Sequence, residues 1–264
     1  MPPSRIAIPV NQPFPWKRTL AYLHWRGTPG LDVIEENRYA RHTASGLVTV
    51  QYDSVRGCLW CEPYAASRVS VLFDTTCDIA AVASTLAPCP TLGPRLQQVP
   101  GLRIPGCWEP FELCLRVILG QQVSVKAAAT FMRRLADVSP NFVPQEIAQS
   151  NLSYVRIPER RSETLRSVAR AAADGSLNLQ LWKDAAVTLK KIPGVGPWTL
   201  DYLAIRLGRD PDAFPESDLG LLRAAGLNDP RALLRRADQW RPYRAYAAMY
   251  LWAVQPLPGA VTLP

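Results

Sequence analysis

Residues 189–208 read LKKIPGVGPWTLDYLAIRLG, and they are the most informative stretch of the chain. Its centre, Ile-Pro-Gly-Val-Gly at 192–196, must reverse the chain direction within a few residues. Pro197 suits the first position of a helix, because a helix start leaves that N–H unpaired in any case. Apolar residues at helical spacing predict one helix over 198–207 and another, before the turn, over 181–190. The stretch therefore predicts two short helices joined by a glycine-rich hairpin.

The hairpin offers a binding site for a phosphate group. Gly194 and Gly196 permit unusual backbone angles and keep side chains out of the way. The amides at the start of the second helix can then approach an anion, which the helix dipole favours. An ordinary turn between two packed helices is the alternative that the stretch alone leaves open. The candidate DNA-contacting residues here are Lys190, Lys191, Pro193, Gly194, Val195 and Gly196.

Further motifs follow along the whole chain. They are PFPW (13–16), RYAR (38–41), RIPGCWEPF (103–111), ILGQQVSV (118–125), F-P-x-x-D (214–218) and WRPYRAYAAMYLW (240–252). In this order, and together with IPGVGPWT, they resemble the helix-hairpin-helix superfamily of DNA glycosylases. Within it the chain is most similar to the bacterial 3-methyladenine DNA glycosylase II type. The resemblance covers nearly the full length, which makes it specific.

The expected fold class is an α+β N-terminal domain followed by an all-α helix-hairpin-helix glycosylase domain. Residues 1–90 predict a small antiparallel sheet with helices, and the proline-rich stretch 87–94 predicts the boundary. Residues 91–264 predict helices only, which the resemblance arranges as two lobes flanking an active-site cleft. Strands are expected within 40–51 and 58–62, and the further helices at 14–25, 78–86, 110–119, 124–136, 159–173, 219–225, 230–238 and 243–254.

The composition favours a polyanionic partner. The net charge is +8 and the pI about 9.4, and residues 101–264 contain 21 of the 30 basic residues and 15 of the 22 acidic ones. No apolar run approaches the ~20 residues of a membrane span, and the N-terminus lacks a secretory signal pattern, so we expect a cytoplasmic protein. Of six cysteines only Cys58 and Cys61 are close in sequence, and there are two histidines, so we expect buried thiols and no metal site.

Asp218 completes the F-P-x-x-D motif immediately before the helix expected over 219–225. Aspartate is a good helix N-cap, as is Ser217 beside it, and spacing alone favours capping. The resemblance implies that Asp218 is the catalytic aspartate of the family. The two roles are compatible, because a capped carboxylate is rigidly aimed.

Trp198 bears on the reaction subtype. Related glycosylases that also cut the DNA strand have a lysine at this step of the hairpin motif, and its amine forms a Schiff base with the sugar. Tryptophan cannot do so. The resemblance therefore implies a monofunctional enzyme that hydrolyses the N-glycosidic bond and leaves an abasic site. Asp218 would stabilise the positive charge on the deoxyribose and orient or deprotonate the attacking water.

The same resemblance implies an aromatic pocket for the flipped base. By position in the family pattern it comprises Trp198, Tyr202, Trp252, Tyr22 and Arg26. An alkylated purine such as 3-methyladenine carries a positive charge, so electron-rich rings attract it through cation–π contacts. Each aromatic residue alone also fits core packing, which is the favoured reading for Tyr22.

Gln121 and Gln122 interrupt two predicted helices. A target base must leave the DNA helix, at a cost in unstacking, and a side chain can fill the vacated space. The resemblance places Gln122 at this wedge, where related sequences are often apolar, while Gln121 also fits a polar loop. Arg156 stands where relatives often have a small glycine, and no cysteine follows Cys114, so the iron–sulfur loop of some relatives is absent.

The sequence thus predicts a monomeric DNA glycosylase acting on alkylated bases in double-stranded DNA, associated with the bacterial nucleoid and not with membranes. No cofactor is expected to be required, and a monovalent cation at the hairpin is compatible with the DNA-bound state. Two alternatives stay open. One is a glycosylase of the same fold for oxidised or deaminated purines, and the other is a non-catalytic protein that binds damaged DNA.

Overall fold

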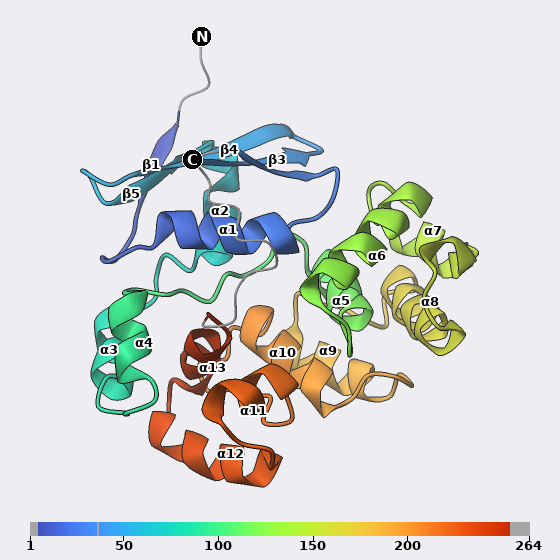
Figure 1. Ribbon diagram of the computed structural model, residues 1–264. Helices are drawn as coiled ribbons and strands as arrows, with labels where there is room; N and C mark the ends of the chain where they lie inside the picture. The colour runs from blue at the N-terminus through green and yellow to red at the C-terminus, as the bar shows by residue number, and fades with distance from the viewer. Residues whose placement is uncertain (1–4, 36, 254–264) are drawn as a thin grey trace.

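A five-stranded antiparallel sheet opens the computed structural model, which describes residues 5–35 and 37–253 (Figure 1). The strand order is β1-β5-β4-β3-β2, so the first strand pairs with the last along Ile6↔Cys61 to Pro9↔Cys58. The β3–β4 turn contains the predicted Ser-Gly pair, and the β4–β5 turn contains Arg-Gly. The strands are β1 (Ile6–Pro9), β2 (Asp32–Glu35), β3 (Arg38–Thr43), β4 (Gly46–Asp53) and β5 (Cys58–Cys61).

Helices make up most of the rest of the described chain. In the N-terminal part they are α1 (Trp16–Arg26), the short 3₁₀ turn η1 (Pro63–Ala65), α2 (Ala66–Phe73), α3 (Ile79–Leu86) and α4 (Gly93–Gln98). They continue with α5 (Pro110–Leu119), α6 (Val125–Val138), α7 (Pro144–Gln149), η2 (Leu152–Val155), α8 (Glu159–Ala173), α9 (Trp182–Lys190) and α10 (Pro197–Arg206). The last are α11 (Leu219–Ala225), α12 (Pro230–Ala237), η3 (Asp238–Trp240) and α13 (Arg244–Ala253).

One face of the sheet is covered by α1, with α2 packed beside it (Figure 1). Val48 and Val50 alternate inward along β4 and are fully buried against Leu20 of α1 and Phe73 of α2. A buried ion network fastens this unit to α5. Arg41 of β3 binds Glu112 of α5 at 2.6 Å, and so the sheet is held next to the helical part of the molecule.

Two helical clusters lie on either side of α10. In the first, which we call the α13 lobe, α3, α4, α11 and α12 pack with α13, and in the second, the α8 lobe, α5, α6, α7 and α9 pack with α8. Leu203 and Ile205 of α10 are both fully buried, the former in the α8 lobe and the latter in the α13 lobe. Helix α10 therefore joins the two lobes.

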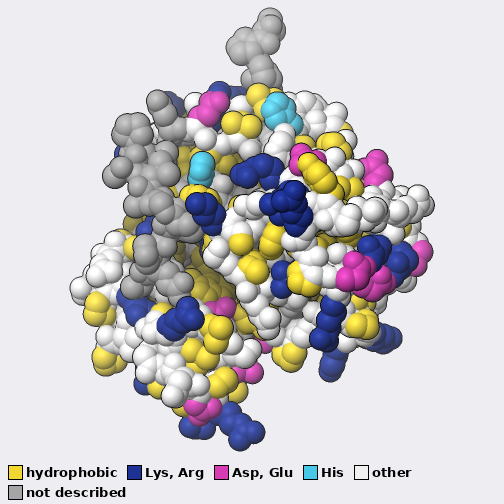
Figure 2. All heavy atoms as spheres, turned by 45° about the vertical axis from the view of Figure 1, so that its right-hand side comes forward, with side chains coloured by type: hydrophobic (Ala, Val, Ile, Leu, Met, Phe, Trp, Pro, Cys, Tyr) yellow, Lys and Arg dark blue, Asp and Glu magenta, His cyan; other side chains and the backbone are white. Residues whose placement is uncertain are grey.

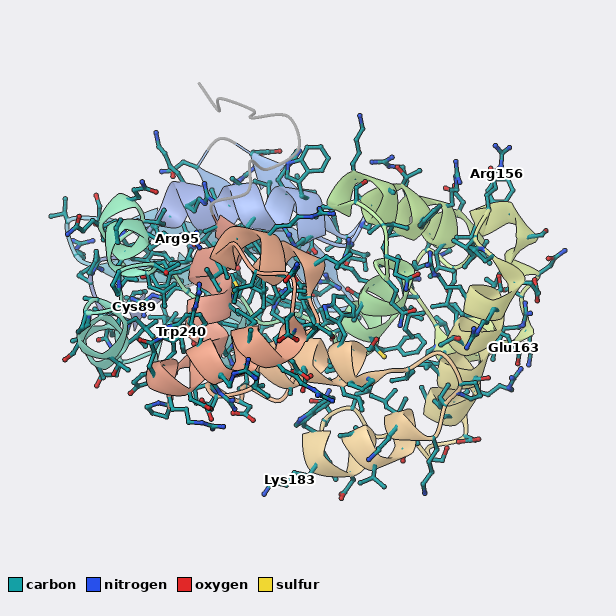
Figure 3. All side chains as sticks on the ribbon, turned by 60° about the horizontal axis from the view of Figure 1, so that its bottom comes forward. Cys89, Arg95, Arg156, Glu163, Lys183 and Trp240 are labelled. Atoms are coloured by element: carbon teal, nitrogen blue, oxygen red, sulfur yellow. The ribbon has the colours of Figure 1, made fainter. Side chains whose placement is uncertain are left out.

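The α13 lobe draws on segments far apart in sequence. The indole N–H of Trp240 donates to the Cys89 sulfur at 3.3 Å, and Arg95 donates to the carbonyl of Ala224 at 2.7 Å. Figure 3 labels Trp240, Cys89 and Arg95 together on one side of the molecule, with Arg156 and Glu163 at the opposite end. The α8 lobe is the part of the chain that carries Arg156 and Glu163.

The fold class predicted from the sequence is confirmed, with a sheet followed by helices. Among its strands and α-helices the structure adds five that the sequence analysis did not predict, namely β1, β2, α2, α4 and α7. Helix α4 starts inside the proline-rich stretch that was predicted as the boundary, because Pro94 fills an early helix position, and Pro144 does the same in α7. The predicted helix over 243–254 is present as α13, and residue 254 itself lies outside the described residues. The division at residue 90 stays a prediction.

Candidate active site

The hairpin is present as predicted, between α9 and α10. Gly194 has a φ of +91°, and a Cβ built there would lie 2.2 Å from the hydroxyl oxygen of Thr164, which itself donates to the carbonyl of Pro193 at 2.9 Å. Gly196 has an ordinary φ of −101°, and a Cβ there would meet nothing within 4 Å. Gly194 is therefore required by the turn, whereas Gly196 keeps a surface open.

The start of α10 presents amides with no intrahelical acceptor, as every helix start does. Gly196 is the N-cap and Pro197 the first helical residue, so the amides of Trp198 and Thr199 follow in the first turn. Lys190 and Lys191 are exposed at the end of α9. Val195, in contrast, points its side chain into the core of the α8 lobe and is 9% exposed. The contacts predicted with DNA at this hairpin stay predictions.

Asp218 is the N-cap of α11, and its carboxylate accepts three hydrogen bonds. Oδ1 accepts from the amide of Leu221 at 2.8 Å and from the indole N–H of Trp252 at 3.0 Å. Oδ2 accepts from the indole N–H of Trp198 at 2.8 Å. The capping role is thus confirmed, and the carboxylate is also fixed from two sides by aromatic residues of α10 and α13.

Three aromatic rings lie together next to this carboxylate, with Tyr202 between the two indoles. Tyr202 stacks on Trp198 with ring centroids 5.5 Å apart and contacts Trp252 at 5.6 Å. Trp198 and Tyr202 are four residues apart on α10 and so lie on the same side of that helix. All three rings are only half-buried, in keeping with a surface that a ligand can reach.

A cluster of arginine and tyrosine side chains lies at the hydroxyl of Tyr202. Tyr22 of α1 accepts one hydrogen bond from Arg206, which also donates to the hydroxyl of Tyr202 at 3.1 Å. The guanidinium carbon of Arg26 lies 4.3 Å from the ring centroid of Tyr22. The structure thus brings the five predicted pocket residues together and adds Arg206, which sequence analysis missed.

The titration of the two tyrosines reflects these surroundings. Burial raises the pKa of Tyr22 to about 12, although Arg206 acts in the opposite direction. Burial would raise the pKa of Tyr202 as well, but the positive charges of Arg206 and Arg26 hold it below its ordinary value. Arg206 remains charged, because the effect of the two tyrosines outweighs burial and raises its pKa.

Gln121 and Gln122 follow α5 and differ in environment. Gln121 donates from Nε2 to the carbonyl of Gly194 and to the hydroxyl of Thr199, both at 2.9 Å, so its side chain fastens the loop to the hairpin. Gln122 is exposed and has a φ of +55°, a left-handed conformation that is unfavourable for a residue with a side chain. A wedge role for Gln122 stays a prediction.

Arg156 has a φ of +60° at the end of η2. This left-handed conformation gives a physical reason why a glycine suits the position in related sequences. The side chain of Arg156 points away from the molecule at the rim of the α8 lobe (Figure 3).

The part of the chain that the structure describes contains no cluster of side chains suited to bind a metal ion. No group of three or more His, Cys, Asp or Glu side chains there is placed to hold an ion. Five of the six cysteines are free and buried, as expected for small apolar side chains, whereas Cys107 is free but only half-buried. Nor is any helix within residues 5–35 and 37–253 long and apolar enough to cross a bilayer.

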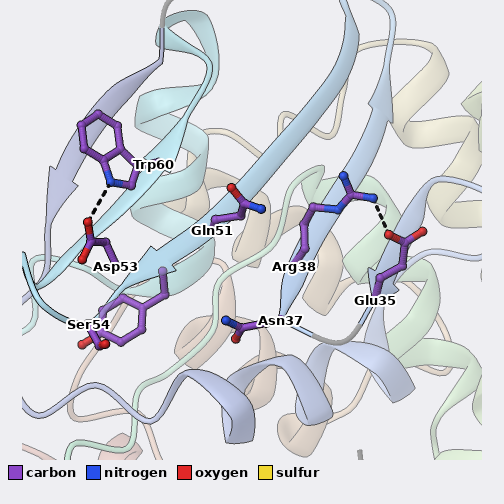
Figure 4. Close-up of a pocket in the computed structure, with 8 residues that line it drawn as sticks. Glu35, Asn37, Arg38, Gln51, Asp53, Ser54 and Trp60 are labelled. Atoms are coloured by element: carbon purple, nitrogen blue, oxygen red, sulfur yellow. Dashed lines mark hydrogen bonds and ion pairs between the residues drawn. The ribbon is translucent and has the colours of Figure 1, made fainter. Parts of the chain in front are cut away.

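The molecular surface is hollowed in more than one place. Figure 2 shows a recess with hydrophobic side chains at its floor and Lys and Arg side chains near its border. A separate open hollow of about 930 Å³ lies on the sheet, between the β2–β3 turn and the end of β4 (Figure 4). There Trp60 donates to Asp53 at 3.4 Å and Arg38 pairs with Glu35, so these four side chains already have partners.

Comparison with known proteins gives consistent matches. Residues 5–109 match the family described as the AlkA N-terminal domain. The chain is 34% identical to DNA-3-methyladenine glycosylase 2 of Escherichia coli over 271 residues, which cover 91% of this chain and 94% of that protein. It is 33% identical to a probable bifunctional transcriptional activator/DNA repair enzyme AlkA of Mycobacterium tuberculosis, over 94% of this chain. This chain spans 56% of the length of the mycobacterial protein.

Solved structures agree on the fold. The 3-methyladenine DNA glycosylase of Archaeoglobus fulgidus superposes with a TM-score of 0.77 at 16% identity, covering 94% of this chain and 97% of that one. The Schizosaccharomyces pombe 3-methyladenine DNA glycosylase, solved in complex with abasic DNA, gives a TM-score of 0.58 at 26% identity, over 65% of this chain and 95% of that one.

Proposed function

The chain belongs to the DNA-3-methyladenine glycosylase 2 family, and from that membership we propose that it excises alkylated bases from double-stranded DNA. Its substrates are of the 3-methyladenine and 7-methylguanine type, and its reaction is hydrolysis of the N-glycosidic bond, the first step of base-excision repair. The observation that carries the proposal is the carboxylate of Asp218, which Trp198 and Trp252 hold beside the ring of Tyr202.

Asp218 would be the catalytic residue. As the bond between C1′ and the base nitrogen breaks, the electron pair leaves with the base and positive charge builds on the deoxyribose. A fixed carboxylate stabilises that charge without having to reorganise. A carboxylate can accept about four hydrogen bonds, and the three donors from Leu221, Trp198 and Trp252 leave an acceptor position for the attacking water.

The hairpin would hold the DNA backbone. The unpaired amides at the start of α10, the open surface at Gly196 and the charges of Lys190 and Lys191 together suit a phosphate group. Such a grip does not depend on base sequence. Gln122 would fill the space left by the flipped base. We propose that the protein works as a monomer on chromosomal DNA in the cytoplasm and needs no cofactor. A monovalent cation at the hairpin is compatible with the DNA complex.

We further propose that the enzyme has no strand-cleaving activity. Trp198 occupies the position at which related lyases have their lysine, and its indole N–H is bonded to Asp218. A tryptophan provides no amine for a Schiff base, so the product would be an intact strand with an abasic site.

The proposal is tested by incubating the protein with methylated duplex DNA and identifying the released bases by chromatography. Release of 3-methyladenine and 7-methylguanine by the wild-type protein, and not by Asp218→Asn, is the expected result. Release of only oxidised or deaminated purines from suitable duplexes would reassign the substrate. Tight binding of damaged duplex without release of any base would contradict an enzymatic function.

A further inference from the structure

Arg206 lies beside the proposed base pocket and is 4% exposed. Its Nη2 donates to the carbonyl of Gly106 at 2.8 Å, and its Nε donates to the carbonyl of Pro105. Its Nη1 donates to the hydroxyl oxygens of both Tyr22 and Tyr202. Within residues 5–35 and 37–253, no carboxylate lies within ion-pair distance of this guanidinium. Arg206 is therefore a buried positive charge that neutral oxygens alone solvate.

The group formed by the three aromatic rings consequently has two sides of opposite charge, because the two indoles face Asp218 and the hydroxyl of Tyr202 faces Arg206. On one side both indole N–H groups point to the carboxylate of Asp218. On the other side the tyrosine hydroxyls meet Arg206, and a second cation, Arg26, lies over the Tyr22 ring. A nucleotide that places its sugar at Asp218 directs its base along the rings toward the cationic end.

The two tyrosine hydroxyls carry two protons, and only one of these can form a hydrogen bond between them. Each oxygen accepts from Arg206 and keeps its own proton. One hydroxyl can donate to the other, which leaves the second proton for an acceptor in the pocket. Because a neighbouring buried cation polarises these hydroxyls, the donor at this end is a strong one.

The charge of the base decides what this donor does. When a cationic alkylated purine leaves, it takes the electron pair of the broken bond and becomes neutral. When a neutral damaged base leaves, it takes the same pair and becomes an anion, so negative charge grows on its ring acceptors. A cation and an O–H donor at the far end stabilise a neutral base as it leaves and becomes an anion. They oppose binding of a base that is already cationic.

We propose that Arg206 is a positioning residue that acts through Tyr22 and Tyr202 to shift the specificity of the pocket from cationic toward neutral damaged bases. This proposal rests on the proposed glycosylase function. It departs from the expectation that the aromatic pocket simply attracts cationic bases. The rings next to Asp218 suit a cation, whereas the tyrosine end does not.

The test compares two duplexes, one with a single hypoxanthine as the neutral base and one with a single 7-methylguanine as the cationic base. Single-turnover excision rate constants are measured for the wild type, Tyr22→Phe and Arg206→Met. Tyr52→Phe is the matched control, because its hydroxyl bonds to Gln12 at 2.9 Å, outside the site. Thermal melting checks that each variant folds.

For Tyr22→Phe we expect the ratio of the neutral to the cationic rate constant to fall about tenfold, the effect of one hydrogen bond to a developing charge. Arg206→Met should lower the ratio at least as far, and Tyr52→Phe should leave it unchanged. If Arg206→Met does not fold, Tyr22→Phe decides alone, because it removes a single hydroxyl.

Other outcomes overturn the inference. An equal fall of both rate constants would mean that Tyr22 and Arg206 serve only the packing of α1 on α10. Release of 7-methylguanine but no hypoxanthine by the wild type would refute the inference and leave the proposed function standing. Release of neither base would refute both.

Discussion

The indole N–H of Trp198 lies 2.8 Å from Oδ2 of Asp218, and this bond joins the start of α10 to the start of α11. Trp198 thus lines the pocket with its ring and aims the carboxylate with its edge. Trp252 repeats the arrangement from α13 on the other oxygen at 3.0 Å. The direction of the Asp218 side chain is therefore set by three elements that only the folded chain brings together.

Asp218→Asn should keep the fold and DNA binding while base release falls by on the order of a thousandfold, because the charge that stabilises the sugar is lost. Asparagine caps a helix about as well as aspartate does, and with its oxygen toward Leu221 and Trp252 only the bond from Trp198 is lost, so the melting temperature should fall by no more than a few degrees. The checks are single-turnover excision, duplex affinity and thermal melting. Excision at the wild-type rate would leave Asp218 with the capping role alone.

Gly194 and Gly196 should respond differently to alanine. At Gly194 the new Cβ meets the hydroxyl of Thr164 and φ is positive, so Gly194→Ala should destabilise the fold by about 1–3 kcal/mol. Gly196→Ala meets no atom and should leave stability within about 0.5 kcal/mol, yet weaken binding to every duplex alike, because the methyl group stands where a phosphate would approach. Thermal melts and affinities for several unrelated sequences decide both points. A loss confined to one sequence would contradict the phosphate grip.

Gln122→Gly should make the protein more stable and less active. The left-handed φ of +55° costs a residue with a side chain about 1 kcal/mol, which glycine avoids. If Gln122 is the wedge, excision from duplex DNA should fall while excision from single-stranded DNA, where no base has to be unstacked, stays the same. An equal effect on both substrates would exclude the wedge role.

Asp201 should make stability depend on pH. Burial, followed by the charge of Glu216, raises the pKa of Asp201 to about 6 in the folded protein, from an ordinary value of about 3.9. The folded state therefore holds the proton more tightly than the unfolded state, and stability is lost as the pH rises from 4 to 6. Asp201→Asn should gain up to about 1 kcal/mol at pH 7.5, after allowance for partial exposure, and nothing at pH 4. A gain of the same size at both pH values would show that the charge is not the cause.

Local patterns predicted the hairpin and the position of Asp218, because both depend on neighbouring residues. Pro197, Gly194 and the spacing of apolar residues determine where α10 starts and ends, and the structure places these features where the sequence did. The N-cap role of Asp218 likewise follows from the residues on either side of it.

The arginine cluster could not be predicted in the same way. Tyr22 and Arg206 are separated by 184 positions, and nothing in either segment indicates the other. A signal for Arg206 did exist, since Trp198, Tyr202 and Arg206 recur every four residues and so share one side of α10. For Gln121 the sequence held no such signal, because its two hydrogen bonds to the hairpin arise only when α5 packs on α10.

Strand cleavage should be absent, and the reason is the chemistry available around Trp198. A lyase needs an uncharged amine within reach of C1′ of the sugar. The lysines nearest in sequence, Lys190 and Lys191, are exposed at the end of α9, on the hairpin side that would meet phosphate. Borohydride added during turnover traps any Schiff base, and a denaturing gel with and without hot alkali shows whether the strand is cut. Strand breaks should appear only after alkali, at the rate of base release. A borohydride-trapped protein–DNA adduct, or breaks without alkali, would mean that another amine acts as the nucleophile. The tryptophan at position 198 would then not indicate a monofunctional glycosylase.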